Sequence, residues 1–361
     1  MLTRLENIVF LNQSYLRRTI MLKIMQHVAI FLLCLATIGV AQSSKGYHVV
    51  KKIVIGGEGG WDYITFDARS HRLFASHGTK VDVISTDSDK VVGEIPKTEG
   101  VHGIAVASEF GRCFVSNGRA STVSIVDLKT LKLIDTVSVG KNPDAILYDP
   151  FSKRVFVFNG RSNNATILDA KKGTVLSTLP LDGKPEFSVT DGKGHVFVNI
   201  EDKSEIVAID AKEMKILSRW SIKPGEEPSG LAIDVKNNRL FSVCSNKLMV
   251  VLDAHKGTVL ASLPIGERTD GCAFDWQTGL AFSANGEGTI TIVREESPLK
   301  FSVLETVKTQ IGGRTITVDP ATHILYIPTA EFGPAPAPTA ERPRPRPAIL
   351  PNTFCILKIQ K

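Results

Sequence analysis

Short apolar stretches, each bounded by turn-forming residues, recur along most of the chain. Between Gly140 and Asp169 the pattern predicts two strands, Ala145–Tyr148 and Arg154–Phe158, and a third strand that ends at Asp169. A fourth strand is predicted over Thr174–Leu179. Val, Ile, Phe and Leu fit a pleated, buried surface, and Pro, Gly, Asn and Asp supply the turns. One sheet of four short strands cannot bury both of its faces, so this unit requires similar units on either side.

The unit recurs with a period of about 40 residues, which is the sequence signature of a β-propeller. Seven copies align on the apolar residue that ends each predicted innermost strand: Phe66, Val106, Tyr148, Thr190, Ile233, Phe274 and Val318. An aspartate follows this residue in every copy except the second, where Ala107 stands. Aspartate bonds to its own backbone and so favours the tight turn between first and second strands. We therefore expect an all-β fold, a seven-bladed β-propeller of four-stranded antiparallel blades.

The last blade lacks a fourth strand of its own. Its predicted strands are Thr315–Val318, Ile324–Ile327 and Thr353–Ile359. Residues Tyr47–Gly57 match a fourth strand and its outgoing turn, and they precede the first innermost strand. The N-terminal strand is therefore predicted to join the last blade, which closes the ring and hides the edges of an open sheet. Residues 330–351 form a proline-rich loop insertion in this blade, either a stiff surface loop or a segment that covers the mouth or binds a partner.

The start of the chain is typical of an export signal. Lys23 precedes an apolar run over Val28–Val40, and small residues lead up to Ala41. We expect residues 1–41 to be a leader and secretory signal peptide and residues 42–361 to be a single propeller domain. The apolar run is short for a membrane span, so we expect no stable membrane anchor after cleavage. The mature protein is expected to be exported, to a periplasm or the cell exterior.

Composition excludes several classes of protein. Cysteines outside the leader form no CxxC or CxxCH motif, which argues against a zinc ribbon and covalent haem. We expect them to be small core residues, and Cys244 with Cys272 is the pair to examine for a disulfide. The formal net charge is +6, but the basic residues form no stripe interleaved with aromatic residues. Nucleic-acid binding is therefore not expected.

Residues at equal offsets in different repeats should form rings around one mouth of the central channel. The position four residues before the alignment residue holds Asp62, His102, Asp144, Glu186, Ser229, Asp270 and Arg314. The ends of the second strands hold His77, Asn117, Asn159, Asn199 and Asn285, and Arg119, Arg161, Glu201 and Glu287 follow in the next loops. We expect both rings to open on one face, giving a polar mouth of mixed charge with an acidic inner ring.

Three interpretations of these rings compete. In the first, the aspartates and asparagines only satisfy turn amides around a water-filled channel. In the second, they bind a divalent cation such as calcium or zinc, with Asp144, Glu186, Asp270 and His102 as candidate ligands. In the third, His102 or His77 pairs with a carboxylate for acid–base chemistry or metal binding. No GxSxG, HExxH or glycine-rich phosphate-binding motif is present.

With the repeats aligned, the chain resembles the YVTN-type β-propeller proteins, in particular the exported YncE-like group. The resemblance is carried by RCFVSNGRASTVSIVDLKTLKLIDTVSVGKNPDAILYDP, RVFVFNGRSNNATILDAKKGTVLSTLPLDGKPEF and EEPSGLAIDVKNNRLFSV, and it spans roughly residues 47–361. The strand motif here is FVSN or FVFN in place of YVTN. The resemblance implies a seven-bladed fold and export more than any reaction, because propellers host many unrelated activities. Neighbouring propeller families include calcium-dependent lactonases, whose ligand positions do not match this sequence residue by residue.

These observations favour an exported module that binds a small molecule or a protein partner through the channel mouth. The first alternative is a metal-assisted hydrolase or lyase, similar to a lactonase, at the same mouth. The second alternative is a scaffold of the cell envelope that uses its rim and the proline-rich loop.

Overall fold

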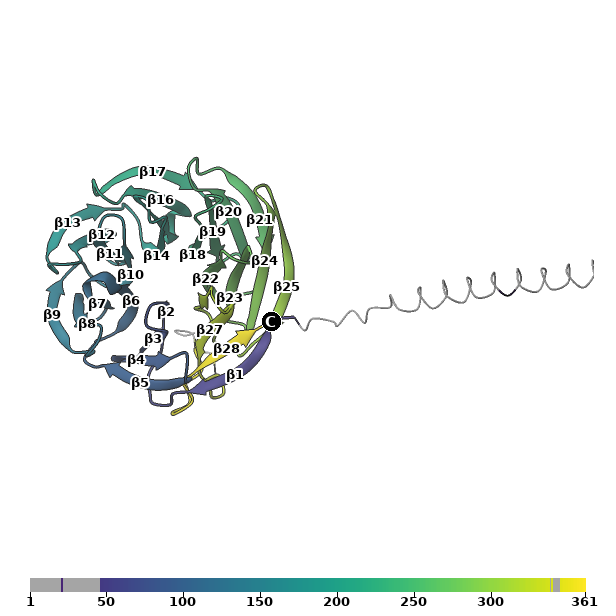
Figure 1. Cartoon of the computed structure of the whole chain (residues 1–361), viewed down its shortest axis with the longest axis horizontal. Coiled ribbons are helices and arrows are strands. Elements are labelled where there is room, and N and C mark those ends of the chain that lie inside the picture. The colour runs from purple at the N-terminus through teal and green to yellow at the C-terminus, as the bar shows by residue number, and fades with distance from the viewer. Residues whose placement is uncertain (1–20, 22–45, 338, 340–344) are drawn as a thin grey trace, which may run out of the picture. The chain divides into compact units, whose positions relative to one another are not determined.

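The computed structural model describes residues 46–337, 339 and 345–361, together with Met21. Residues Gly46–Lys361 form one compact unit in which seven four-stranded antiparallel sheets are arranged around a central channel (Figure 1). Besides Met21, the only helical segments described are two 3₁₀ turns, η1 (Ser108–Phe110) and η2 (Glu201–Lys203). The predicted seven-bladed β-propeller is thus confirmed.

Each blade runs from an innermost strand at the channel to an outermost strand at the rim. Blade 1 consists of β2 (Ile64–Asp67), β3 (Arg72–His77), β4 (Lys80–Ser85) and β5 (Lys90–Ile95). Blade 2 consists of β6 (Val101–Ala107), β7 (Arg112–Asn117), β8 (Thr122–Asp127) and β9 (Leu133–Ser138). Blade 3 consists of β10 (Pro143–Asp149), β11 (Arg154–Asn159), β12 (Asn164–Asp169) and β13 (Val175–Pro180). Blades 4 and 5 consist of β14 (Pro185–Thr190), β15 (His195–Ile200), β16 (Glu205–Asp210) and β17 (Lys215–Ser221); and β18 (Pro228–Asp234), β19 (Arg239–Cys244), β20 (Leu248–Asp253) and β21 (Val259–Pro264). Blades 6 and 7 consist of β22 (Thr269–Asp275), β23 (Leu280–Asn285), β24 (Thr289–Ser297) and β25 (Lys300–Lys308); and β26 (Thr317–Asp319), β27 (Ile324–Thr329), β28 (Cys355–Gln360) and β1 (His48–Val54).

Blade 7 joins the two ends of the propeller domain. Strand β1 pairs antiparallel with β28, with His48 opposite Gln360 and Val54 opposite Cys355. Tyr47 is buried against Phe282 of blade 6, and their ring centroids lie 5.6 Å apart. The predicted closure of the last blade by the N-terminal strand is confirmed.

The aspartates that follow six of the seven innermost strands accept hydrogen bonds in the next turn, and some of them also link neighbouring blades. Asp67 accepts a bond from the Arg69 amide, and the Ser108 hydroxyl of blade 2 donates to the same carboxylate at 3.2 Å. The Thr190 hydroxyl of blade 4 likewise donates to Asp149 of blade 3 at 2.6 Å. Buried carboxylates need hydrogen-bond partners. The aspartate at this position therefore stabilises both the turn of its own blade and the contact with the next blade.

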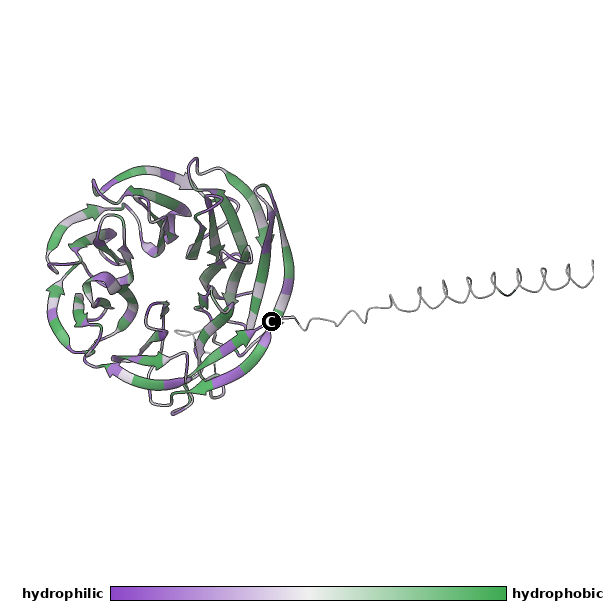
Figure 2. Ribbon diagram, viewed as in Figure 1, coloured by the Kyte–Doolittle hydropathy of each residue, from purple (hydrophilic) through white to green (hydrophobic). Residues whose placement is uncertain are grey.

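Seven apolar clusters form the core, and most of them join strands of adjacent blades. Figure 2 shows hydrophobic residues concentrated in the strands nearer the channel. Cys113, Cys244, Cys272 and Cys355 are all buried and free. The prediction of core thiols is confirmed, and Cys244 and Cys272 form no disulfide with each other.

The proline-rich loop insertion at 330–351 begins and ends in a short antiparallel contact. Phe332 and Ile349 form an isolated β-bridge, and the Gly333 amide donates to the Ala348 carbonyl. Residues 338 and 340–344 of this insertion lie outside the described residues, as do the predicted leader and signal at 1–41, apart from Met21. Across the described part of the chain, no helix is both long and apolar enough to span a membrane.

Candidate functional site

β-Bulges in the innermost strands place the predicted inner ring at the channel. In β10 the register shifts between Pro143 and Ile146, so Asp144 and Ala145 together face one residue of β11. Shifts at the equivalent place occur in β6, β14, β18 and β22. A bulge bends its strand and changes the direction of a side chain. It therefore allows one polar side chain to point into the channel although its neighbours in the strand are buried.

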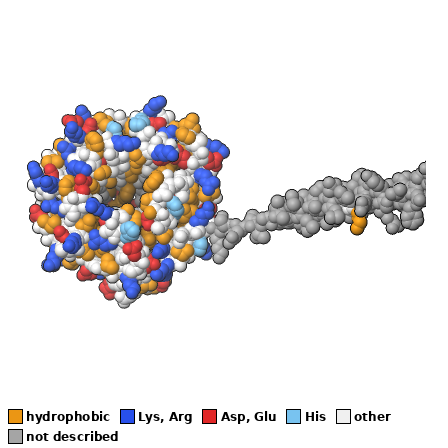
Figure 3. Space-filling view, viewed as in Figure 1, with side chains coloured by type: hydrophobic (Ala, Val, Ile, Leu, Met, Phe, Trp, Pro, Cys, Tyr) orange, Lys and Arg blue, Asp and Glu red, His pale blue; other side chains and the backbone are white. Residues whose placement is uncertain are grey.

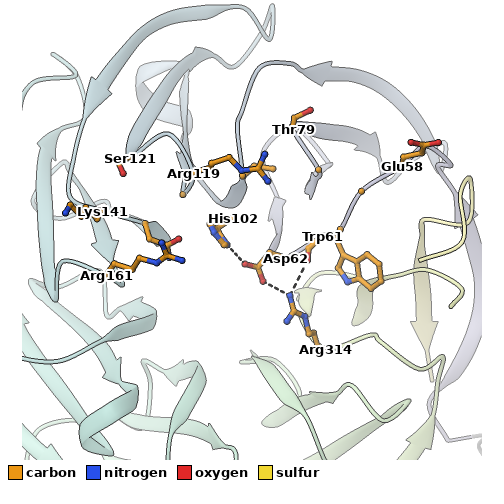
Figure 4. A pocket seen from close by; sticks show the side chains of 17 residues that line it. Glu58, Trp61, Asp62, Thr79, His102, Arg119, Ser121, Lys141, Arg161 and Arg314 are labelled. Carbon is orange, nitrogen blue, oxygen red and sulfur yellow. Dashed lines mark hydrogen bonds and ion pairs between the residues drawn. The ribbon is translucent and has the colours of Figure 1, made fainter. Parts of the chain in front are cut away.

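Five of the predicted ring residues form one connected charge network. His102 Nδ1 lies 2.6 Å from Asp62 Oδ2 and 3.6 Å from Asp144 Oδ1. On the other side of Asp62, Arg314 Nη2 donates to Oδ1 at 3.2 Å. Arg314 Nη1 reaches Asp270 at 3.1 Å, and so links blades 1, 6 and 7. Figure 4 shows His102 and Arg314 converging on Asp62 from opposite sides.

The two remaining ring residues have other partners. Glu186 pairs with Lys184 of the same blade at 2.7 Å, and Lys184 also contacts Glu201. The Ser229 hydroxyl donates to the Thr269 carbonyl of the next blade. Lys184 was not predicted as a site residue, although a lysine two residues before a ring carboxylate is a visible signal in the sequence.

Crowding of buried carboxylates changes their protonation. Burial, together with the charge of Asp62, raises the pKa of Asp144 to about 6. Burial and the charge of Asp144 raise the pKa of Glu186 to about 8, and burial raises the pKa of Asp270 to about 7. Burial alone would lower the pKa of His102, but its hydrogen bond to Asp62 and the charge of Asp144 outweigh burial and raise this pKa to about 9. At neutral pH the imidazole is therefore protonated, and the network retains protons on part of its carboxylates.

Two aromatic side chains from different blades meet in the channel. Tyr63 of blade 1 and Phe187 of blade 4 come from opposite sides of the ring, and their ring centroids lie 5.2 Å apart. Burial and the surrounding carboxylates, Asp144 first among them, raise the pKa of the Tyr63 hydroxyl well above its usual value. Figure 3 shows hydrophobic side chains at the bottom of the central hollow. The two aromatic side chains therefore narrow the channel at that level, and the sequence interpretation missed both residues.

The predicted second ring does not face the channel. Asn117, Asn159, Asn199 and Asn285 are essentially fully buried. Asn117 donates to Thr122 and Ser124 of the next strand, and Asn159 donates to Asn164 and Thr166 in the same way. The expectation that both rings open on one face is corrected for these amides, because hydroxyl and amide partners on the third strand hold them inside the blade.

Asn199 and His77 are held inside the propeller by other contacts. Asn199 reaches the Ser229 and Gly230 carbonyls of the neighbouring blade. His77 is buried, with Nδ1 2.8 Å from Asp82 and its ring tilted against Phe354 at a centroid distance of 4.2 Å. Neither side chain lines the mouth, so the same correction applies to both.

A cavity of about 950 Å³ lies over the charge network. Its lining includes Asp62, His102 and Arg314, and also the predicted loop residues Arg119 and Arg161. Lys141 and Ser121 lie on the same side as these two arginines, while Trp61 and Glu58 lie opposite (Figure 4). Backbone from loops with glycines at 59, 60, 78, 100 and 118 forms much of the remaining wall. A Cβ on Gly118 would lie 2.5 Å from His102 Nε2, so that glycine leaves room for the imidazole.

One group of side chains has the spacing of a metal site. Single ligand atoms of Asp62, His102 and Asp144 all lie within 4.8 Å of one another. Of the predicted metal ligands, this group contains His102 and Asp144, while Asp62 takes the place of Glu186 and Asp270. Nitrogen and carboxylate donors of this kind suit zinc or a harder divalent cation.

Comparisons with known proteins show the fold alone. No protein-family profile matches the sequence, and no curated protein does. Among solved structures, Kuenenia stuttgartiensis hydrazine synthase is similar with a TM-score of 0.67 at 16% identity, over 79% of this chain and 95% of that chain. U3-55K has a TM-score of 0.69 at 10% identity, covering 86% and 98%. The WD40 repeats of RRP9 have a TM-score of 0.71 at 10% identity, covering 88% and 98%. The propeller is confirmed by these neighbours, and the resemblance to the YncE-like group stays a prediction.

Proposed function

We propose that the protein is a binding module that holds a small organic anion in the cavity at the mouth of its channel. The observation that carries this proposal is the charge of the cavity lining. Both Asp62 oxygens are paired with cationic side chains, His102 on one and Arg314 on the other. Lys141 and Arg161, by contrast, form no ion pair with any described residue, and Arg119 has only Glu99 at 3.9 Å. Glu58 on the opposite wall also forms no ion pair with any described residue, so the unpaired charge of the cavity lining is positive on balance, with Lys141 and Arg161 against Glu58.

The cavity also has the size and wall of a small-molecule site. Its volume of about 950 Å³ lies within the range of ligand pockets in proteins. Tyr63 and Phe187 meet beneath it and narrow the channel at that level. Guanidinium groups bind carboxylate and phosphate oxygens in pairs of parallel hydrogen bonds, which gives orientation as well as affinity.

Citrate, a compact polycarboxylate, is a suitable probe in isothermal titration calorimetry at low ionic strength. We expect Arg161→Ala to weaken citrate binding about ten-fold, the loss of roughly one charged hydrogen bond. Lys171→Ala is the matched control, because Lys171 is an exposed cation of the same blade in the turn after β12, at the end of that strand opposite Arg161. Equal citrate affinity in both variants, or no binding of citrate and related anions by the unaltered protein, would contradict the proposal.

The Asp62–His102–Asp144 group favours a second candidate, a metal-assisted hydrolase or lyase at the same mouth. It ranks below anion binding because a cation would have to displace His102 or Arg314 from Asp62. This candidate expects stoichiometric zinc or calcium in the purified protein by elemental analysis, and its loss in Asp144→Ala and His102→Ala. Glu287→Ala, a loop carboxylate outside the group, should keep the metal. A metal-free protein with no activity toward lactones or esters excludes this function.

A further inference from the structure

A second cavity of about 680 Å³ adjoins the first. Gly60, Trp61 and Arg314 line both cavities, so the two are lobes of one depression on either side of Trp61 and Arg314. Arg314 is held in place by Asp62 and Asp270. The border between the lobes is therefore a fixed feature of the mouth.

The walls of the second cavity are mainly apolar. The apolar side chains are those of Trp61, Phe332, Pro345, Pro347 and Ile349, and the polar lining residues are Arg268, Thr269, Asp270, Arg314 and Arg346. Trp61 lies between two phenylalanines, with centroid distances of 6.0 Å to Phe332 and 5.7 Å to Phe354. The β-bridge between Phe332 and Ile349 keeps that side of the wall together. An apolar group that binds in this cavity is removed from water. This favours binding roughly in proportion to the apolar area that is buried.

Both cavities have positive side chains, and the second also has an extended apolar wall. The first cavity has Arg119, Lys141 and Arg161 on one side. In the second cavity Arg314 is paired with carboxylates, and Arg268 and Arg346 are exposed side chains of the lining. These two arginines attract anions toward the mouth, while Phe332, Pro345, Pro347 and Ile349 line the second cavity and not the first.

We propose that one amphipathic organic anion occupies both cavities, with its acidic group in the first cavity and an apolar chain in the second. This inference rests on the proposed function and adds the chemical class of the ligand. The acidic group lies against Arg119, Lys141 and Arg161, and the chain passes Trp61 to reach Phe332, Pro347 and Ile349. A purely polar anion would use the first cavity alone.

Straight-chain carboxylates from butanoate to decanoate test the proposal by calorimetry on the unaltered protein. Affinity is expected to rise about four-fold with each methylene group that enters the second cavity, and then to level off. The n-alcohols of equal length should bind at least ten-fold more weakly, because they lack the charge. Arg161→Ala should weaken every acid by a similar factor and leave the dependence on length unchanged.

Ile349→Glu should remove most of the dependence on chain length, because it places a charge in the apolar wall. Leu350→Glu is the matched control, since Leu350 is an exposed neighbour that does not line the cavity. If citrate binds through Arg161 while acids of all lengths bind equally, this inference is wrong and the proposed function stands. If neither citrate nor any acid binds, both are wrong. A length dependence unchanged in Ile349→Glu also overturns the inference.

Discussion

The free energy of unfolding is expected to fall by about 5 kcal/mol as the pH rises from 5 to 9.5 in chelator-treated protein. The cause is the crowding of buried ionisable groups in the inner ring, which comprises the charge network and Glu186 beside it. Glu186 and Asp270 have pKa values raised to about 8 and about 7, chiefly by burial. A carboxyl group whose pKa is raised on folding favours the folded state while it stays protonated. Its contribution is present below the unfolded pKa and disappears as the pH rises through the folded value.

The histidine of the network acts in the same direction. His102 has a pKa raised to about 9 by its bond to Asp62 and the charge of Asp144, which outweigh the effect of burial. A histidine with a raised pKa stabilises the folded state fully below the unfolded value, and this stability is lost as the pH rises through 9. Folding raises the pKa values of the carboxyl groups and of the imidazole alike. All of these groups therefore lower the free energy of unfolding as the pH rises, and their effects reinforce each other on the alkaline side. The group contributions overlap, since the charges interact, and the total is smaller than their sum.

Urea denaturation at pH 5, 7 and 9.5 measures this fall directly. The triple variant Asp144→Asn, Glu186→Gln, Asp270→Asn should lose most of the dependence, because neutral amides no longer release protons. Glu213→Gln is the control, an exposed carboxylate in the turn that follows β16. A stability that stays level or rises between pH 5 and 9.5 would show that the network is not strained by its own charge.

Equal spacing in the sequence predicts the inner ring because the repeat and the bulge recur together. The position of Asp144 relative to Tyr148 is that of His102 relative to Val106, and both lie in bulges of equivalent register. Because the backbone repeats, residues at the same position in each repeat lie at the same level along the channel. The spacing alone therefore predicted that Asp62, His102 and Asp144 lie close together.

The asparagine ring shows where this reasoning stops. Asn117 and Asn159 also occur at equal offsets, yet their side chains point to the third strand of their own blade. Successive side chains of a strand point to opposite faces of the sheet. A residue one position further along the strand therefore points into the interior of the propeller instead of toward the channel mouth. Ser124 and Thr166, which follow each asparagine by the same number of residues, were a usable signal.

The contact between Tyr63 and Phe187 could not be predicted from the repeats. The residue after the ring position is small in several blades, as at Gly103 and Ala145, and large and aromatic only at Tyr63 and Phe187. The number of blades and the closure of the ring were predicted, and together they set the width of the channel. Whether two such residues meet across that width also depends on the direction of each side chain, which the spacing of the repeats does not give.

Deleting residues 46–55 is expected to abolish cooperative unfolding and to leave an aggregation-prone chain. Strand β1 is the outermost strand of blade 7, and without it β28 presents an unpaired edge. Tyr47 and Ile53 also leave the apolar clusters they share with Phe282 and Phe354. Loss of a strand that joins both ends of the ring removes packing from two blades at once, so the effect exceeds that of any single core substitution.

A circular permutant distinguishes closure from mere loss of residues. His48 lies opposite Gln360 in an antiparallel pair, so residues 46–55 can follow Lys361 through a short Asn-Gly turn. In that chain β1 becomes the second arm of a hairpin with β28, and blade 7 contains four consecutive strands. We expect the permutant to recover a single sharp thermal transition by calorimetry and circular dichroism, and a chain that only lacks residues 1–45 to behave like the full protein. Cooperative melting of the simple deletion, or failure of the permutant alone, would mean that β1 does not close the propeller.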